Sequence, residues 1–253
     1  MVKLNIKLFI PFLLIAFLII NSCGNKEKES IEYNAKGLSK IDNRDYVGAI
    51  TDYDKAIELN PINAEAYFNR GIANYEVKNF NASIMDHNKA IKLNSNYAEA
   101  YIGRGNSKYQ NKDYDGAYKD FNKAIELSPN NYLPYIGRAI VKTQNNDYAG
   151  AIKDCTKSIE LKSDYESSYS VRGIAKYQNG DCKGAINDFS SIIKMNPKNA
   201  DAFDNRGMAK YKTGDMEGAG LDFQKAVELG SEDAKEHLLN YEYNMRILFG
   251  YWE

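Results

Sequence analysis

Two histidines and many carboxylates are the side chains of this chain that could act as a general acid or base or hold a metal ion. Neither His87 nor His237 has a second group of metal-binding residue types beside it, and the carboxylates recur regularly instead of forming one unique cluster. His87 occupies a position where the other repeats described below carry mostly aromatic residues, which favours a core role. The sequence has no Gly-rich phosphate loop, no Ser-centred nucleophile elbow and no zinc-ligand spacing. These observations predict a protein that is not an enzyme and that uses no metal ion and no cofactor.

Cys23 lies where a covalent modification is expected, at the end of an N-terminal leader. Lys3 and Lys7 precede the apolar run LFIPFLLIAFLII (8–20), and the chain then reads NSC. A positive segment, a short apolar segment and small residues at the exit are typical of a secretory signal. Thirteen helical residues span about 20 Å, which is short of a bilayer core of roughly 30 Å. The sequence therefore favours a cleaved leader over a permanent membrane span.

The segment INSC (20–23) resembles the signal of bacterial lipoproteins, which usually has Leu, a small residue, then Gly, Ala or Ser, and Cys. The resemblance implies residues 1–22 as the signal peptide, cleavage before Cys23, and acylation of its thiol and new amino group, with palmitate as a lipid. Residues 23–30 are then the lipid-anchored cysteine and a flexible polar tether. Because Gly24 follows the cysteine, the resemblance implies a lipid-anchored location in the bacterial cell envelope, at the outer rather than the inner membrane. The alternative is an ordinary leader that contains a cysteine.

Two further cysteines and the charge pattern point to an ordinary protein surface and core. Cys155 and Cys182 stand where equivalent positions carry mostly Phe, Tyr or Met, which predicts two small buried hydrophobic side chains. A disulfide between them is the alternative, disfavoured because they lie at different heights on neighbouring predicted helices.

The net charge is -1 and the charges are interspersed, which predicts no nucleic-acid partner.

The elements that position these residues follow a period of 34 residues. Residues 171–189 read VRGIAKYQNGDCKGAINDF, and residues 205–223 read NRGMAKYKTGDMEGAGLDF. Position 4 is aromatic and positions 8, 20 and 27 are mostly small. Positions 4, 8 and 11 share one helical face, as do 20, 24 and 27, so each repeat predicts a helical hairpin that buries its apolar face by stacking. The six repeats are 30–63, 64–97, 98–131, 132–165, 166–199 and 200–233.

This pattern resembles the tetratricopeptide repeat (TPR) family, which has an aromatic residue at positions 4 and 24, small residues at 8, 20 and 27, and Pro at 32. The resemblance covers residues 30–233 and implies an all-α protein, a right-handed α-solenoid of about six TPR hairpins over residues 31–233. Residues 234–253 are expected to be a capping helix and tail. An apolar stripe over residues 232–249 predicts this helix: Ala234, Leu238, Tyr241, Met245 and Leu248.

A cation at position 7, where the family usually has Leu, and an acid at position 23 recur through the chain. Because one lies on each first helix and the other on each second helix, they predict a ladder of structural ion pairs along the stack. The cations are Arg70, Arg104, Arg138, Arg172 and Arg206, the acids are Asp86, Asp120, Asp154, Asp188 and Asp222, and the first repeat has Lys36 and Asp52.

The resemblance also implies a concave groove lined by the first helices, into which positions 2, 5, 9, 12 and 13 generally point. Tyrosine has a rigid apolar face and a hydrogen-bonding tip, which suits it to interfaces. Positions 5 and 12 predict a partner-binding groove formed by Phe68, Tyr75, Ile102, Tyr109, Ile136, Tyr177 and Tyr211. The alternative is that these tyrosines only pack between neighbouring first helices.

The chain is therefore interpreted as a non-catalytic TPR scaffold that binds a protein or extended peptide and is held at the membrane through its N-terminal lipid. The alternatives are a structural subunit of an envelope assembly and a glycan-handling surface lipoprotein, because aromatic side chains also stack on sugars. The sequence lacks the Lys and Arg clamp with which some TPR proteins hold a C-terminal carboxylate. A neutral or basic extended segment is thus the expected ligand.

Overall fold

The computed structural model describes the backbone of residues 9–249 and the side chains of residues 24–245. Over this range the chain is all-helical, without a strand. The predicted signal peptide, the Cys23 and Leu248 side chains and the last four residues lie outside the described side chains. The helices of this range are α1 (Phe9–Asp42), α2 (Tyr46–Leu59), α3 (Ala64–Glu76), α4 (Phe80–Leu93), α5 (Ala98–Gln110), α6 (Tyr114–Leu127), α7 (Leu133–Gln144), α8 (Tyr148–Leu161), α9 (Glu166–Gln178), α10 (Cys182–Met195), α11 (Ala200–Thr213), α12 (Met216–Glu228) and α13 (Glu232–Phe249).

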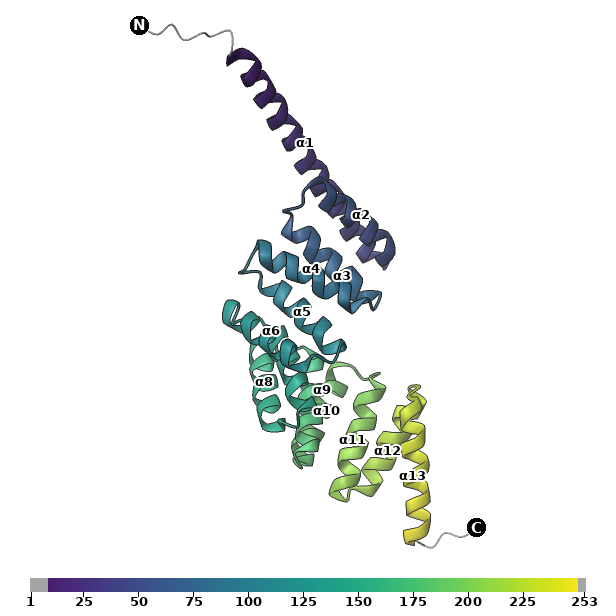
Figure 1. Cartoon of the computed structure of the whole chain (residues 1–253). Helices are drawn as coiled ribbons and strands as arrows, with labels where there is room; N and C mark the ends of the chain where they lie inside the picture. Colours follow the sequence, from purple (N-terminus) through teal and green to yellow (C-terminus); the bar gives the residue numbers. More distant parts are fainter. Residues whose placement is uncertain (1–8, 250–253) are drawn as a thin grey trace. The chain divides into compact units, whose positions relative to one another are not determined.

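The helices form two compact units, one up to Leu127 and one from Ser128. In the first unit the hairpins α1–α2, α3–α4 and α5–α6 stack in sequence order, with α2 against α3 and α4 against α5 (Figure 1). In the second unit α7–α8, α9–α10 and α11–α12 stack in the same way, and α13 packs against α12 and α11. The prediction of about six helical hairpins followed by a C-terminal helix is confirmed.

A left-handed residue followed by a capping residue makes the turn inside each hairpin. The capping residue, at position 16, is Asp or Asn. Asp181 is an example, because its Oδ1 accepts a hydrogen bond of 2.9 Å from the backbone N–H of Gly184. Such a cap satisfies one of the free N–H groups at the start of the second helix. The left-handed residues, at position 15, are Arg44, Lys78, Lys112 and Asn146 with φ of 60–63°, and Gly180 and Gly214 with φ of 86° and 87°.

Glycine at position 8 lets the two helices of a hairpin approach closely. A Cβ added to Gly173 would lie 2.8 Å from the ring of Phe189 at position 24. The fourth hairpin has Ala139 at position 8, and its position 24 is the smaller Cys155; both are fully buried. Cys155 and Cys182 are free and buried, as the sequence predicts, and burial raises the pKa of the Cys155 thiol to about 12. The larger residue at position 8 of this hairpin is thus matched by a smaller residue at position 24.

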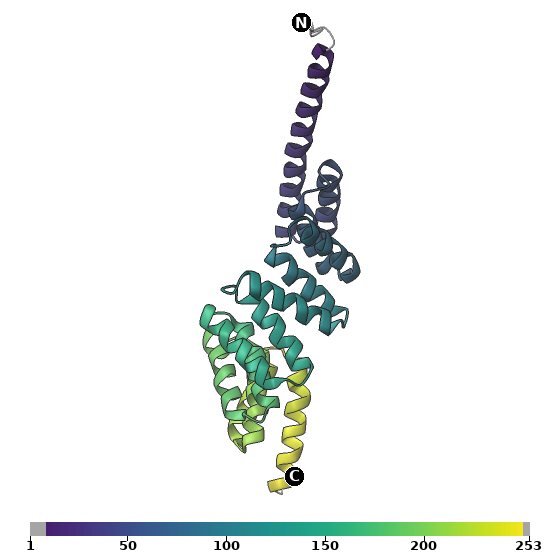
Figure 2. The same ribbon diagram turned by 60° about the vertical axis from the view of Figure 1, so that its left-hand side comes forward.

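The helix α1 continues through the segment for which the sequence predicts a flexible tether. Residues 24–30 are helical because they contain no proline and are rich in Lys and Glu, which favour helix. Residues 24–29 are exposed, whereas Ser30 is buried and donates a hydrogen bond of 2.8 Å to the carbonyl of Ala56. The N-terminal part of α1 extends beyond α2 (Figures 1 and 2).

None of the helices within the described residues combines the length and the apolar character needed to cross a membrane.

The C-terminal helix α13 covers the open side of the second unit. A seventh repeat would begin at residue 234, but α13 begins at Glu232, after Ser231, whose Oγ accepts a hydrogen bond of 3.2 Å from the N–H of Ala234. The described members of the predicted apolar stripe are buried or half-buried: Ala234, Leu238, Tyr241 and Met245.

Candidate partner-binding groove

The tyrosines at position 12 of the first unit are half-buried, with part of each ring packed and part accessible. Tyr75 contacts Phe80 at 5.5 Å between ring centroids, and Tyr109 contacts Tyr114 at 5.3 Å. The Tyr75 hydroxyl accepts a hydrogen bond of 3.3 Å from Gln110 on the following first helix. Burial, with a smaller contribution from Tyr114, raises the pKa of Tyr109. Each of these tyrosines therefore has a packed ring face and a polar tip near the surface.

The tyrosines at position 12 of the second unit repeat this arrangement. Tyr177 packs on the core of α10 and α11, and the Nζ of Lys212 lies 4.6 Å from its ring centroid. Tyr211 contacts Tyr241 at 6.3 Å, and its hydroxyl accepts a hydrogen bond of 3.3 Å from Asn244 on α13. Gln110, Lys212 and Asn244 all come from the next first helix. Tyr75, Tyr177 and Tyr211 thus contact the next first helix, as the packing alternative expects, and all four position-12 tyrosines remain partly exposed.

The prediction that position 5 lines the groove is wrong for Ile102 and Ile136, which are only 9% and 6% exposed. Around Ile102, α5 approaches α4 closely. A Cβ added to Gly103, beside Ile102, would lie 2.5 Å from Nε2 of His87. Phe68 is half-buried and stacks on Tyr97 at 4.8 Å, so it offers a ligand only part of its ring.

Positions 2 and 9, which the resemblance also points into the groove, carry exposed aliphatic side chains that were not among the predicted groove residues. Leu38 and Ile174 at position 9 are 41% and 36% exposed, and Ile31 and Leu133 at position 2 are 60% and 39% exposed. Position 9 lies three residues before the tyrosine column, on the same helical face. That spacing could have identified it.

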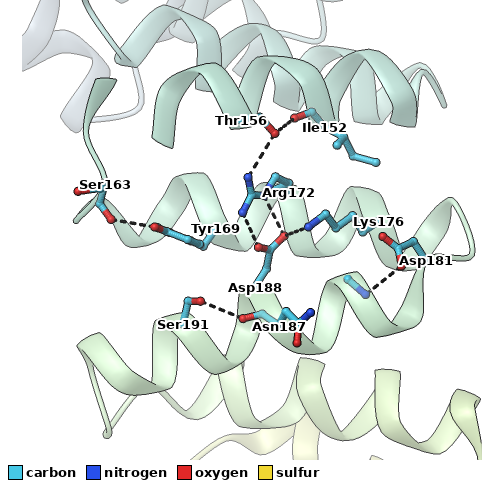
Figure 3. Close-up of polar contacts among 11 residues, drawn as sticks. Ile152, Thr156, Ser163, Tyr169, Arg172, Lys176, Asp181, Asn187, Asp188 and Ser191 are labelled. Atoms are coloured by element: carbon cyan, nitrogen blue, oxygen red, sulfur yellow. Dashed lines mark hydrogen bonds and ion pairs between the residues drawn. The ribbon is translucent and has the colours of Figure 1, made fainter. Parts of the chain in front are cut away.

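The recurring arginine at position 7 and acid at position 23 form an ion pair within each hairpin from the second to the sixth. In the fifth repeat, Nε and Nη2 of Arg172 donate to Asp188 at 3.0 and 2.7 Å, and Nζ of Lys176 lies 2.9 Å from the same carboxylate (Figure 3). Nη1 of Arg172 donates to Thr156 on α8 at 3.2 Å. Arg172 therefore joins its own hairpin to the preceding one.

The same pair forms in four other repeats, with the shortest N···O distances between 2.5 and 2.7 Å: Arg70–Asp86, Arg104–Asp120, Arg138–Asp154 and Arg206–Asp222. These acids have side chains only 4–6% exposed. Because both oxygens of each carboxylate are engaged within the hairpin, the pairs serve to hold the helices together.

Position 11 supplies a second partner to the acid, which the sequence analysis missed. Lys108, Lys142 and Lys210 lie 2.8 Å from Asp120, Asp154 and Asp222. Each lysine follows its arginine by four residues, a spacing that puts both on one helical face.

The first two repeats depart from this arrangement. In the second repeat Asn74 donates to Asp86 at 2.9 Å. In the first, Lys40 pairs with Asp52 at 2.6 Å, while Lys36 lies 4.4 Å from the ring centroid of Tyr33.

The two histidines occupy structural positions within their units. His87 is 1% exposed and contacts Phe68 at 5.6 Å between ring centroids. His237 binds Asp204 through Nδ1 at 2.8 Å. Within residues 24–245, no three His, Cys, Asp or Glu side chains are grouped so that they could hold a metal ion.

Three models of one repeat family match the chain. A "TPR repeat" model matches residues 41–78, and two "Tetratricopeptide repeat" models match residues 98–131 and 171–234. No curated protein matches the chain in sequence.

Solved TPR structures share the fold. YrrB, described as a TPR protein with an unusual peptide-binding site, is 24% identical with a TM-score of 0.60, over 74% of this chain and 97% of YrrB. PilF of Pseudomonas aeruginosa is 19% identical with a TM-score of 0.74, over 85% of this chain and 99% of PilF. A chain of the APC/C Cut9–Hcn1 hetero-tetramer is 14% identical with a TM-score of 0.76, over 89% of this chain and 45% of that one.

Proposed function

Because the chain carries tetratricopeptide repeats in both of its units, we propose that it is a non-catalytic scaffold that binds an extended peptide or protein segment along its first helices. The observation that carries the proposal is the recurrence of half-buried tyrosines with a packed ring and a free edge at position 12. In the fifth repeat the exposed Ile174 at position 9 lies one helical turn before Tyr177. A rigid aromatic face beside a hydrogen-bonding tip suits a surface that binds peptides. The peptide-binding site named for YrrB, which shares this fold, is consistent with the proposal.

The groove proposal is tested by replacing Tyr109 with a photoreactive residue in the full chain and crosslinking in cells. We expect a protein or peptide adduct at this position. The matched control is the same residue at Tyr118, a 38% exposed tyrosine on the second helix α6, where no adduct is expected. Tyr109→Ala and Tyr177→Ala should each lower the affinity for the captured partner by roughly ten-fold or more, in protein that circular dichroism shows to be still folded. Adducts at Tyr118 alone would contradict the groove and place the contacts on the second helices.

The scaffold is further proposed to act at the bacterial cell envelope, attached by lipid at Cys23 and located at the outer membrane. The support is the leader with its two lysines, its short apolar run and the Cys23 that ends it. Two or more acyl chains give stable anchoring to a bilayer. The α1 helix after Gly24 would then place the hairpins away from the membrane surface.

The lipid proposal predicts the behaviour of a cysteine variant. In cells fed labelled palmitate, the wild type and Cys182→Ala should carry label and fractionate with membranes. Cys23→Ala should lose the label, because it has no thiol to acylate. Label retained in Cys23→Ala would contradict modification at this residue.

A further inference from the structure

The helix α13 is a seventh first helix whose register is shifted by a shortened loop. Its contacts identify the equivalent positions. Asn244 donates to Tyr211 as Gln110 donates to Tyr75, but the two residues are 33 positions apart instead of 35. The first residue of α13 thus corresponds to position 1 of the regular repeats.

This register places Tyr241 at position 10, where the other first helices of the second unit carry Val141, Ala175 and Ala209. The large ring is accommodated because position 21 of the preceding second helix is Gly220, where the other repeats have Ile or Tyr. A Cβ added to Gly220 would lie 2.9 Å from the Tyr241 ring.

A hollow lies between α13 and the preceding hairpin α11–α12, and Tyr241 is part of its lining. The hollow has a volume of about 220 Å³. Its walls carry Tyr211 and Tyr241, whose rings meet edge to face at 78°, and the ring of Phe223. Met208, His237, Asn240 and Asn244 complete the lining. The pocket therefore combines aromatic faces with side-chain amide oxygens, which accept hydrogen bonds.

The surroundings of this pocket are acidic. Burial raises the pKa of Asp204, and the charges of Asp233 and Asp201 add to this rise, whereas the hydrogen bond and charge of the pocket residue His237 oppose it. Burial also raises the pKa of Tyr241, with Glu217 and Glu242 adding to the shift. The nearby lysines have other partners, since Lys212 lies over Tyr177 and Lys235 pairs with Glu232. An aromatic pocket in a negative field is complementary to a cation.

We infer that the pocket between α11 and α13 binds an arginine side chain of an extended peptide that lies along the first helices. A guanidinium is planar, stacks on aromatic rings and presents several N–H donors to the amide oxygens of Asn240 and Asn244. This inference rests on the proposed groove function and adds to it a specificity site made by the capping helix.

The test uses three labelled peptides of Ala and Ser with a central Arg, citrulline or Leu, titrated against the full chain by fluorescence anisotropy. Citrulline keeps the shape of arginine and removes the charge. We expect the Arg peptide to bind roughly 5- to 30-fold more tightly than the citrulline and Leu peptides. Tyr241→Ala, which removes one aromatic wall, and Met208→Trp, which fills the hollow, should each abolish this preference.

Tyr243→Ala is the matched control, because this tyrosine lies on the same helix, is 65% exposed and is not part of the pocket lining. It should bind all three peptides like the wild type. Met208→Trp keeps the test valid if Tyr241→Ala fails to fold. Equal binding of the three peptides, or an Arg preference that survives Met208→Trp, would overturn the arginine pocket. Crosslinking at Tyr109 has a separate readout, so an adduct there without an Arg preference leaves the groove standing and removes only the pocket.

Discussion

Replacement of Asp188 by alanine is expected to lower the free energy of unfolding of the second unit by about 3–5 kcal/mol. The Asp188 side chain is 4% exposed and lies between Arg172 and Lys176, whose side chains are 16% and 18% exposed. Without the Asp188 carboxylate, the two largely buried cations have no counter-ion and repel each other. The unpaired charges cause this loss, because removing one partner of a buried pair costs more than the pair contributes.

Chemical unfolding followed by helical circular dichroism measures this change, and native-state hydrogen exchange assigns it to α9 and α10. The matched control is Glu160→Ala in the same unit, which breaks an ion pair with Lys157 whose side chains are 46% and 60% exposed. Because solvent screens their charges, such exposed ion pairs contribute less than about 1 kcal/mol to the free energy of unfolding. If Asp188→Ala and Glu160→Ala unfold alike, the recurring pairs do not stabilise the hairpins.

Acidification is expected to destabilise the first unit through His87. Burial, with a smaller contribution from the charge of Arg104, lowers the pKa of His87 from 6.5 to about 4. The folded unit therefore holds the neutral imidazole, whereas the unfolded chain binds a proton below its ordinary pKa. The contribution of the neutral His87 to the free energy of unfolding is fully present above pH 6.5. It is lost as the pH falls toward 4, and the total loss is about 3 kcal/mol.

The measurement compares hydrogen exchange in α4 and α5 between pH 7.5 and pH 5 in the wild type and in His87→Phe. Phenylalanine stands at this position in three other repeats, as Phe121, Phe189 and Phe223. We expect the variant to lose the histidine-dependent part of the pH slope, about 1.4 kcal/mol per pH unit. Carboxylate titrations contribute equally to both proteins and cancel in the difference. His237→Gln, in the other unit, should leave the slope of the first unit unchanged, and parallel slopes for wild type and His87→Phe would contradict a buried neutral histidine.

The groove shows where a residue pattern predicts a site and where it fails. The period places Tyr75, Tyr109, Tyr177 and Tyr211 at equivalent positions, and the structure shows each of them half-buried on a first helix. The same reasoning selected Ile102, which is buried. The repeat period predicts toward which side of its helix a residue points. It does not predict how closely the neighbouring helix packs on that side, and this packing sets the burial of the residue. Gly103, whose neighbour is the ring of His87, decides it here.

The helical hairpins, their order, the pairing of the Arg and Asp columns and the capping helix could all be predicted from the residues, because they follow from the period and from residue size at fixed positions. Three features emerged only from the packed helices: Lys176 and its counterparts also bind the acids, Ile102 is buried, and α13 starts two residues earlier than the period predicts, which sets Tyr241 against Gly220. The physical reason is that a repeat specifies the contacts it shares with every other repeat. Contacts at positions that depart from the repeat depend on the distances between the helices. All the side chains packed between the helices set these distances together.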